Sequence, residues 1–471
     1  MPFDARFRPA IRHAQLGDDF FDVVAAAEFP QHRIRFRNQP WAAALGLGGL
    51  TEAEWTDHFG RFRPLLGSFE QPLALRYHGH QFRSFNPQLG DGRGFLFAQL
   101  EEEGGRLLDL GTKGTGTTPW SRGADGRLTL KGGVREVLAA QLLEAQGVDT
   151  SKPFSLVETG ENLVRQDEPS PTRSAVLVRL NHSHVRIGSF QRLAFNRDTA
   201  GVQRLMEYCL DNYLPEAAGR DATAFLEAVM RRVARTGAQW MAAGFVHGVL
   251  NTDNINITGE SFDYGPWRFL PTYDPNFTAA YFDYNGLYAY GRQPQTLLWN
   301  LARLAECLLP LSSMDALQGT LEGFAPAFEA AWTEAWLQRL GLRSLGQEAD
   351  TQLCVLWESF LGESQAPFEQ AVFDWQGGLA SGVRAAASPS AAHYATPAFA
   401  AFKERLEDFR AVDTTRLEHP YFHRAIPAAR LLIDELEALW APIAESDDWS
   451  LFEAKLAAIA ELGQAMGTSR G

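Results

Sequence analysis

The spacing of apolar residues changes along the chain and predicts two regions of different structure. Two short apolar runs, 94–100 and 107–110, flank a turn rich in Glu and Gly and predict a β-hairpin. Apolar residues three and four positions apart over 134–145 predict a helix, and residues 174–190 are again rich in strand-forming side chains. Together these segments predict a first region of mixed α and β structure.

From residue 202 onward, the apolar positions follow helical spacing almost everywhere. A long amphipathic helix is predicted over 222–243. Beyond residue 310, stripes of Trp, Leu and Ala are typical of helices packed in a core rather than of a cofactor site. Segment 377–392, which contains Gly and Ser, is expected to be a flexible connection. The pattern therefore predicts a helical second region.

Composition narrows the class of protein. The chain has 471 residues, of which 45% are hydrophobic, enough to bury a large core in two or three closely packed lobes. Its net charge of -14 argues against non-specific binding to nucleic acid or to an anionic membrane. No apolar run approaches the ~20 residues of a membrane span, and the N-terminus has no apolar signal-peptide core. We therefore expect a cytoplasmic monomer that binds neither nucleic acid nor membrane.

The three cysteines, Cys209, Cys307 and Cys354, are far apart and stand in apolar helical surroundings. Their spacing matches neither a disulfide framework nor a zinc site. They indicate a reducing compartment, which agrees with the expected cytoplasmic location.

The segment from His247 to Gly265, HGVLNTDNINITGESFDYG, carries the clearest chemical signal. A protein kinase has the catalytic loop H-R-D-x-x-x-x-N, followed by D-F-G, whose Asp binds the metal. Here Asn254 falls at the position of the loop Asn, and Asp263-Tyr264-Gly265 falls at that of D-F-G. Val249 occupies the position of the catalytic Asp. The pattern predicts the metal ligands of a kinase without its usual base, with His247 as a structural residue that positions the loop.

Asn254 and Asp263 suit Mg²⁺, which binds carboxylate and amide oxygens together with nucleotide phosphates. Alternating apolar residues, a turn and a return strand over 255–262 predict a hairpin that brings the two ligands together. Asp253 then lies beside the metal, where it can replace the missing base. In the alternative interpretation, Asp253 and Asn254 are ordinary turn residues.

Three glycines, Gly90, Gly92 and Gly94, alternate ahead of the predicted hairpin at 94–110. Without Cβ atoms, their backbone can approach a phosphate closely, although a plain turn has the same composition. Lys113 follows the second strand, where a kinase fold has its phosphate-binding lysine. Glu136 is expected to pair with Lys113, unless it is a surface residue in the first turn of a helix, where the dipole favours it.

Arg179 and Arg186 lie seven residues apart in strand-like sequence. On one regular strand this odd separation places them on opposite faces, so they converge only if the chain bends at 181–183. Two converging guanidinium groups would bind phosphate oxygens in fork geometry, whereas in the alternative both face solvent. His182 and His184 form an H-x-H pair, but the sequence offers no third ligand for a metal.

Several motifs in the same order resemble the selenoprotein O family, pseudokinase-fold protein adenylyltransferases of bacteria and mitochondria. They are Arg76-Tyr77-His78-Gly79-His80-Gln81-Phe82, Asn86 to Gly94, Asp109 to Gly114, and His247 to Asn254 with Asp263 to Pro266. The clear resemblance covers about residues 40–310. With the kinase-like motifs, it predicts a protein-kinase-like bilobal α+β fold. An N-terminal β-rich lobe would precede a large helical C-terminal lobe that carries extra helices.

The expected organisation has four parts. They are an N-terminal extension over 1–75, a nucleotide-binding N-lobe over 76–195, a C-lobe with the catalytic loop and metal motif over 196–310, and a helical C-terminal extension over 311–471. Members of the family commonly end near a cysteine or selenocysteine, whereas residues 463–471 of this chain contain none. The resemblance therefore gives no basis here for redox control through such a thiol.

In that family, ATP binds flipped relative to kinases, so that its α-phosphate faces the acceptor and AMP is transferred. The resemblance implies that Asp253 accepts the proton and that Asn254 and Asp263 bind Mg²⁺ or Mn²⁺. The residues expected to contact or support the nucleotide are Gly90, Gly92, Arg93, Lys113, Asp125, Gly126, Glu136, Arg179, Arg186 and Asp263.

The sequence thus predicts a protein adenylyltransferase that transfers AMP from ATP to Ser, Thr or Tyr hydroxyls of protein substrates. One alternative is a phosphotransferase of the aminoglycoside-kinase type, whose H-G-D-x-x-x-x-N loop resembles His247-Gly248 and Asn254 but has Asp where this chain has Val249. The other is a non-catalytic, ATP-binding pseudokinase scaffold. The intact metal pair and the adjacent carboxylate favour an enzyme over a scaffold.

Overall fold

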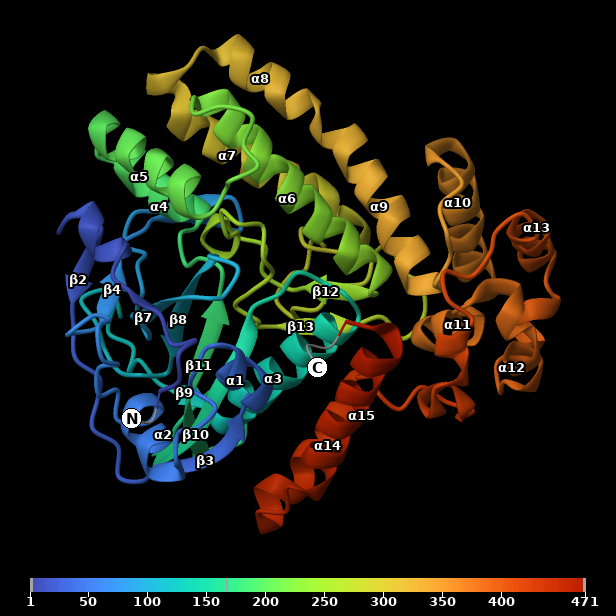
Figure 1. Ribbon diagram of the computed structural model, residues 1–471, viewed down its shortest axis with the longest axis horizontal. Helices are drawn as coiled ribbons and strands as arrows, with labels where there is room; N and C mark the ends of the chain where they lie inside the picture. Colours follow the sequence, from blue (N-terminus) through green and yellow to red (C-terminus); the bar gives the residue numbers. More distant parts are fainter. Residues whose placement is uncertain (1–2, 167, 469–471) are drawn as a thin grey trace.

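A nine-stranded antiparallel sheet forms one half of the molecule and helices form the other, in the residues that the structure describes, 3–166 and 168–468 (Figure 1). The structure is a computed structural model. The strand order is β2-β4-β7-β8-β11-β10-β3, with β1 beside β7 and β9 beside β11. The strands are β1 (Pro9–Ala10), β2 (Phe21–Val23), β3 (Arg33–Arg37), β4 (Leu73–Leu75), β7 (Leu96–Glu101), β8 (Leu107–Lys113), β9 (Leu128–Thr129), β10 (Lys152–Leu163) and β11 (Thr172–Asn181).

Both faces of this sheet are buried, because successive side chains of a strand point to opposite sides. Val176 of β11 belongs to the core cluster that contains Trp55 of α2 (Glu52–Phe59). Its neighbour Leu177 belongs to the cluster that contains the apolar residues of α3 (Leu130–Ala145). The sheet therefore lies between α3 on one side and the N-terminal helices on the other, which include α1 (Gln39–Ala44).

Helix α6 (Ala222–Ala242) is the central helix of the helical half. It begins after Asp221, whose carboxylate accepts a hydrogen bond from the Ala224 N–H at 2.9 Å and so stabilises the helix start. Helices α7, α8 and α9 pack around it. The other helices of this half are α4 (Ile187–Phe195), α5 (Thr199–Asn212), α7 (Gln293–Leu308), α8 (Met314–Glu322) and α9 (Phe324–Leu340).

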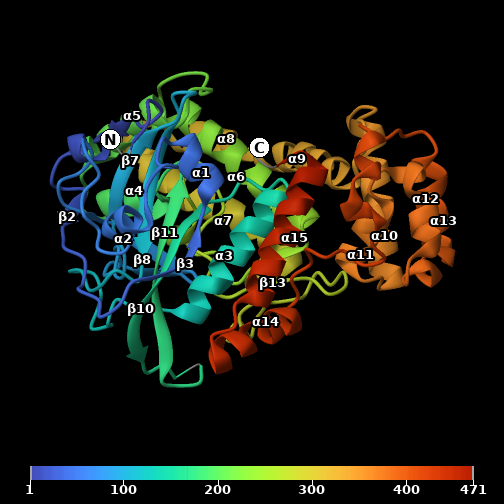
Figure 2. The ribbon, with the colours of Figure 1, turned by 60° about the horizontal axis from the view of Figure 1, so that its bottom comes forward.

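The C-terminal helices form two groups (Figure 1). The first group projects beyond α9, and the second returns to the sheet, where α15 packs along α3 (Figure 2). Asp447, which follows α14, lies 2.9 Å from Arg35 and 2.6 Å from Arg173 of the sheet. The last helices are thus attached to the sheet half. The two groups are α10 (Gln347–Ser364), α11 (Phe368–Trp375), α12 (Gly382–Ala387) and α13 (Pro397–Leu406), and then α14 (Ile433–Ser446) and α15 (Ser450–Met466).

Smaller elements complete the chain. Two short hairpins pair β5 (Gly79–Gln81) with β6 (Ser84–Asn86), and β12 (Phe245–His247) with β13 (Trp267–Phe269). The 3₁₀ helices are His13–Leu16, Thr252–Asn254, Tyr290–Arg292, Leu309–Leu311, Gly378–Ser381, Ala391–Ala395, Thr415–Glu418 and Pro420–His423. In the described part of the chain, no helix combines the length and apolar character needed to cross a membrane.

The α+β class and most predicted elements are confirmed: the β7–β8 hairpin, α3, α6 and the helices beyond residue 310 all occur. The predictions for segments 174–190 and 377–392 are wrong. The strand-like pattern over 174–190 ends early, because β11 stops at Asn181 and α4 begins at Ile187. Segment 377–392 is largely helical rather than a flexible connection, because Gly377 and Gly378 adopt positive φ and turn the chain directly into the next helical turn. The arrangement is consistent with two lobes, and the three boundaries between the four expected parts stay predictions.

Candidate active site

A cleft of about 900 Å³ lies between the glycine loop that precedes β7 and the loop that follows β12. The predicted site residues that line it are Gly90, Gly92, Arg93, Asp125, Gly126, Asp253, Asn254 and Asp263. The remaining ones, Lys113, Glu136, Arg179 and Arg186, are buried directly behind this lining. The fold therefore brings all of the predicted site residues together.

Gly90 and Gly92 allow their loop to lie against Trp120. A Cβ atom at Gly90 would approach the Trp120 ring to 2.3 Å, and one at Gly92 would approach the Trp120 carbonyl oxygen to 2.8 Å. Gly126, at the opposite wall, has a φ of +67° and would place a Cβ 2.1 Å from the Gly116 carbonyl oxygen. A larger residue would displace the Trp120 ring at position 90 and backbone atoms at positions 92 and 126. The glycines therefore allow the close packing that shapes the walls of the cleft. The alternative interpretation, a plain turn, does not explain this packing.

Asp125 stands at the rim of the cleft and already has partners. Its carboxylate accepts hydrogen bonds from Arg165 at 2.8 Å and from the Arg127 N–H at 3.0 Å. Burial raises the pKa of Asp125, but these bonds and the charge of Arg165 outweigh burial, so the pKa lies below its ordinary value. A direct contact between Asp125 and a nucleotide stays a prediction.

Lys113 and Arg179 each bridge the same two carboxylates. Lys113 Nζ lies 2.6 Å from Glu136 Oε2 and 2.8 Å from Asp263 Oδ1. Arg179 Nη1 lies 3.3 Å from Glu136 Oε1 and 3.2 Å from Asp263 Oδ1. The predicted pairing of Lys113 with Glu136 is thus confirmed, and Glu136 is buried rather than on the surface. Removing one partner of such a buried pair costs about 3–5 kcal/mol, because the other charge loses its compensation.

Arg179 and Arg186 converge, because the chain bends between β11 and α4 as predicted. Their Cζ atoms lie 5.8 and 5.1 Å from the centre of the Phe262 ring. Arg186 donates one hydrogen bond to Asp91 Oδ1 and one to the carbonyl oxygen of Asp253, each at 3.3 Å. Both guanidinium groups are buried, so the interpretation in which they face solvent is wrong.

Asp253 projects from the 3₁₀ turn Thr252–Asn254 into the cleft. The residue is 8% exposed, and its Oδ1 has no hydrogen-bond partner among the described residues. Burial raises the pKa of Asp253 to about 6, against the opposing attraction of Arg186. A Cβ atom at position 79 would lie 2.9 Å from Asp253 Oδ1, so Gly79 leaves room for the carboxylate. A carboxylate with a raised pKa and a free oxygen is suited to accept a proton near neutral pH.

Asp263 and Asn254 present oxygen atoms to the same cleft. Burial raises the pKa of Asp263, but the positive charges of Lys113 and Arg179 outweigh burial and hold the pKa well below its ordinary range. Asp263 adopts a φ of +59°, a left-handed conformation that is uncommon outside glycine. Asn254 donates its Nδ2 to the Val249 carbonyl oxygen at 2.9 Å, which turns its Oδ1 away from that carbonyl. The donor set is therefore one ionised carboxylate and one amide oxygen, with Asp253 beside them.

The predicted hairpin over 255–262 is wrong. The Ile187 N–H donates to the Ile255 carbonyl oxygen at 3.0 Å, and the Ile257 N–H donates to the Val185 carbonyl oxygen at 2.9 Å. These bonds occupy backbone groups that the hairpin would have paired with each other. They also attach the loop that carries the predicted metal ligands to the bend that carries Arg186.

His247 positions the loop, as predicted. Its Nε2–H donates to the Phe262 carbonyl oxygen at 3.2 Å, because a carbonyl can only accept. Its Nδ1 then accepts from the Val249 N–H at 3.3 Å. Burial lowers the pKa of His247, so the imidazole is neutral at physiological pH. The ring thus joins the start of the loop to the residue before Asp263.

His182 and His184 pack inside the bend that follows β11. His184 Nδ1 lies 3.6 Å from the Asp109 carboxylate, and His182 Nδ1 lies 3.5 Å from Arg232. Burial lowers the pKa of both rings, that of His182 to about 3. Among residues 3–166 and 168–468, no three His, Cys, Asp or Glu side chains are grouped so that they could hold a metal ion.

The sequence-based prediction missed Tyr77 and Asp91, which hold Arg186. The Tyr77 ring centre lies 4.3 Å from Arg186 Cζ, and Asp91 accepts from both Arg186 and the Leu75 N–H. Asp91 could have been identified from its position between Gly90 and Gly92. Nothing in the spacing of the chain connects Tyr77 with Arg186.

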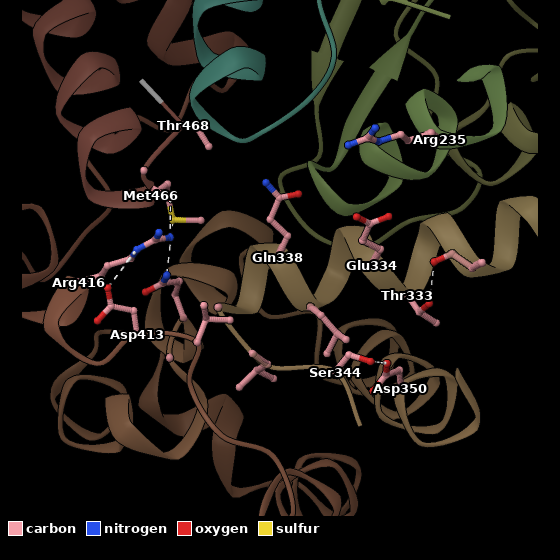
Figure 3. Close-up of a pocket in the computed structure, with 18 of the residues that line it drawn as sticks. Arg235, Thr333, Glu334, Gln338, Ser344, Asp350, Asp413, Arg416, Met466 and Thr468 are labelled. Atoms are coloured by element: carbon pink, nitrogen blue, oxygen red, sulfur yellow. Dashed lines mark hydrogen bonds and ion pairs between the residues drawn. The ribbon is translucent and has the colours of Figure 1, made fainter. Parts of the chain in front are cut away.

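A second cavity, of about 620 Å³, lies between α9 and the C-terminal end of α15 (Figure 3). Several of its polar side chains bond to each other: Ser344 donates to Asp350, and Arg416 lies 3.6 Å from Asp413. None of the site residues predicted from the sequence lines this cavity. The cleft around Asp253 is therefore the candidate active site.

Comparison with known proteins identifies an enzyme of the nucleotidyltransferase class. The family model described as "Protein adenylyltransferase SelO" matches residues 3–460, and the chain belongs to this family. The resemblance thus extends well beyond the 40–310 that the motifs indicated. The family description names the class of reaction, and it names neither an acceptor residue nor an orientation of ATP.

The relatives carry the name protein nucleotidyltransferase YdiU. One from Synechocystis sp. is 43% identical over 476 residues, which cover 95% of this chain and 96% of the relative. One from Gloeobacter violaceus is 45% identical over 463 residues, which cover 95% and 93%. One from Synechococcus elongatus is 49% identical over 352 residues, which cover 73% and 68%.

Proposed function

We propose that the protein transfers AMP from ATP to Ser, Thr or Tyr hydroxyl groups of protein substrates, within a kinase-like bilobal fold. The observation that carries this proposal is Asp253, which lines the cleft and whose buried Oδ1 has no hydrogen-bond partner among the described residues. The position at which a kinase has its base holds Val249, which cannot accept a proton.

The phosphates of ATP are assigned to the cationic wall formed by Lys113, Arg179 and Arg186, with Arg93 at the cleft surface. Guanidinium groups bind phosphate oxygens in fork geometry, and a lysine supplies a compact charge. A kinase orientation would direct adenine toward Arg179 and Arg186 and the γ-phosphate toward the loop. The buried arginines favour the flipped orientation, in which the α-phosphate faces Asp253.

The donor set of the cleft fits Mg²⁺ or Mn²⁺. Asn254 and Asp263 are the residues that would hold the ion, and the low pKa of Asp263 keeps its carboxylate ionised. When bound, such an ion neutralises phosphate charge and makes phosphorus more open to attack. Asp253 remains available as the proton acceptor.

In the proposed reaction, the acceptor hydroxyl oxygen attacks the α-phosphorus of ATP. A new bond forms between that oxygen and phosphorus, and the bond from the α-phosphorus to the bridging oxygen breaks. Pyrophosphate leaves, and the hydroxyl proton passes to the carboxylate of Asp253. Arg186 donates to the Asp253 carbonyl oxygen and is itself held by Asp91, so it keeps the loop in register with the phosphate site.

The site gives less support to two other functions. Transfer of the γ-phosphoryl group, as in the aminoglycoside kinases, requires a base at the position of Val249. A non-catalytic scaffold has no use for a desolvated carboxylate beside a metal pair, since burying it costs free energy.

ATP labelled separately at the α and γ positions tests this proposal. The protein is incubated with Mg²⁺, with either labelled ATP, and with a mixture of acceptor proteins. We expect protein-bound label from the α position only, and none with Asp263→Asn. Label from the γ position would identify a kinase instead, and the absence of either label would indicate a scaffold.

A further inference from the structure

Exposed Phe and Tyr side chains gather in one region of the part of the chain that the structure describes. We call this region the aromatic rim, and it consists of Phe82, Phe195, Tyr281, Phe282 and Tyr284. Tyr281 and Tyr284 are the most open, at 77% and 88% exposure. The Phe82 ring lies 5.8 Å from Phe282, and Phe195 lies 5.3 Å from Phe85 of β6. Contiguous exposed apolar surface of this kind marks interaction sites.

The turn of the β5–β6 hairpin presents Phe82 at an energetic cost. Gln81 pairs with Ser84, so Phe82 and Arg83 are the two central residues of the turn, with φ of +48° and +64°. Such turns favour Asn and Gly, because a side chain with a Cβ is strained at positive φ. Strained residues that persist in a fold often serve a function rather than stability. Here the strain exposes a phenylalanine ring.

The hairpin is attached directly to the catalytic loop. The His80 N–H donates to Thr252 Oγ1 at 2.7 Å, and the Phe82 N–H donates to Asn251 Oδ1 at 3.1 Å. Tyr288, whose ring lies 4.8 Å from that of Phe82, also donates to Asn251, at 2.8 Å. Because Asn251 and Thr252 lead directly to Asp253, the position of Phe82 relative to the proposed base is fixed.

The hairpin also sets the distance between the rim and the proposed base. Gly79, at its start, is the residue packed against Asp253 Oδ1. Phe82 begins the turn three residues after Gly79, and three residues of extended chain span about 10 Å. Gln81 and Asn251, between them, line the cleft, so the cleft opens toward Phe82. An extended acceptor segment covers the same distance in about three residues.

We propose that the aromatic rim docks the acceptor protein. Its occupant is an extended segment with a large apolar side chain about three residues from the acceptor hydroxyl. A neighbouring acidic residue of that segment would meet Arg83, which is exposed, lies 5.5 Å above the Trp299 ring, and has no carboxylate partner among the described residues. This inference rests on the proposed function, since it names where the acceptor of AMP binds.

Synthetic peptides test the proposal with α-labelled ATP and Mg²⁺. Each peptide has a central Tyr, Ser or Thr in a Gly-Ala background, and a single Phe that is moved from five residues before the hydroxyl to five residues after it. We expect labelling to be about 10-fold higher when the Phe is about three residues away on one side. Adding Asp next to that Phe should increase labelling further, and Arg83→Glu should reverse that increase.

Two rim variants and one control separate docking from folding. Phe82→Asn and Tyr281→Ser/Tyr284→Ser are expected to lower peptide labelling about 10-fold and to remove the preference for Phe position, with the KM for ATP unchanged. Phe82→Asn should melt at the same temperature or higher, because Asn tolerates positive φ. Val383→Ser, on α12 and 87% exposed, is the matched control and should change neither property.

Each contrary outcome has a distinct meaning. If wild-type protein labels all peptides equally, docking at the rim is overturned while AMP transfer stands. If the rim variants raise the KM for ATP and keep the preference for Phe position, the rim holds the nucleotide base and the proposal is overturned. If no peptide takes up α-label, transfer to protein hydroxyls fails, and acceptor docking fails with it.

Discussion

Asp253 and Asp263 line the same cleft, yet their surroundings drive them to opposite protonation behaviour. Asp253 is buried, its Oδ1 has no hydrogen-bond partner among the described residues, and burial raises its pKa to about 6 against the attraction of Arg186 and Arg122. Asp263 lies within 3.2 Å of both Lys113 and Arg179, which hold its pKa well below the ordinary range. When the pKa values of two nearby carboxyl groups are shifted in opposite directions, the two groups usually have different roles in the reaction. Here Asp253 is suited to accept a proton, and Asp263 to remain an anion.

The comparison of the two carboxylates predicts that a substitution at Asp263 has the largest effect on activity. Asp263→Asn should lower AMP transfer by at least about 10⁴-fold, because it removes the only ionised carboxylate among the proposed metal ligands. It should also lower the free energy of unfolding by about 3 kcal/mol, because Lys113 and Arg179 lose a buried partner. Label transfer and urea denaturation measure the two effects, with the exposed Asp18→Asn as a control. Activity close to wild type in Asp263→Asn would contradict the assignment.

Asp253→Asn is expected to lower kcat by about 10²- to 10⁴-fold, the usual contribution of a positioned general base. The KM for ATP should stay within about 2-fold of wild type, because Asp253 faces the acceptor rather than the phosphate wall. Steady-state kinetics with α-labelled ATP measure both values. Adding Val249→Asp should not restore activity. Full activity in Asp253→Asn, alone or combined with Val249→Asp, would show that Asp253 is not the base.

The raised pKa of Asp253 also predicts a pH-dependent stability in metal-free buffer. Between pH 3.8 and about 6, the native carboxyl keeps a proton that the unfolded chain has released, so stability falls as pH rises through this window. Asn does not ionise in this range, so the Asp253→Asn variant should not lose stability as the pH rises. Its free energy of unfolding should exceed that of wild type by up to about 3 kcal/mol above pH 6, and by almost nothing below pH 4. Chemical denaturation in EDTA tests this, and a difference that does not vary with pH would contradict the burial of a carboxylate at this site.

The smallest effect is expected at the cationic wall. Arg179→Lys and Arg186→Lys keep the positive charge but lose the guanidinium fork, and each should raise the KM for ATP about 10-fold. Arg231→Lys is the matched control, because Arg231 is an exposed residue of α6 whose side chain pairs with Glu227. Isothermal titration calorimetry should show weaker binding of ATP to Arg179→Lys and Arg186→Lys than to Arg231→Lys. Equal affinities in all three variants would contradict the assignment of phosphates to this wall.

Local patterns predicted those parts of the molecule that depend on neighbours in sequence. The β7–β8 hairpin and α6 follow from the spacing of apolar residues, and the pairing of Lys113 with Glu136 follows from the kinase-like order of elements. The hairpin over 255–262 was predicted wrongly because its backbone partners, Val185 and Ile187, lie far away in sequence.

The chemistry of Asp253 illustrates a second limit of sequence reasoning. Its position beside the proposed metal ligands could be predicted from the loop motif. Its raised pKa could not, because burial depends on the β5–β6 hairpin, where Gly79 packs against the carboxylate. Tyr77, which stacks on Arg186, was missed for the same reason.

A structure with Mg²⁺ and the non-hydrolysable analogue α,β-methylene ATP tests the central claim most directly. The account predicts the α-phosphorus beside the carboxylate of Asp253, the β- and γ-phosphates on Lys113, Arg179 and Arg186, and the ion on Asn254 and Asp263. Adenine against Arg179 and Arg186, with the γ-phosphorus beside Asp253, would contradict it.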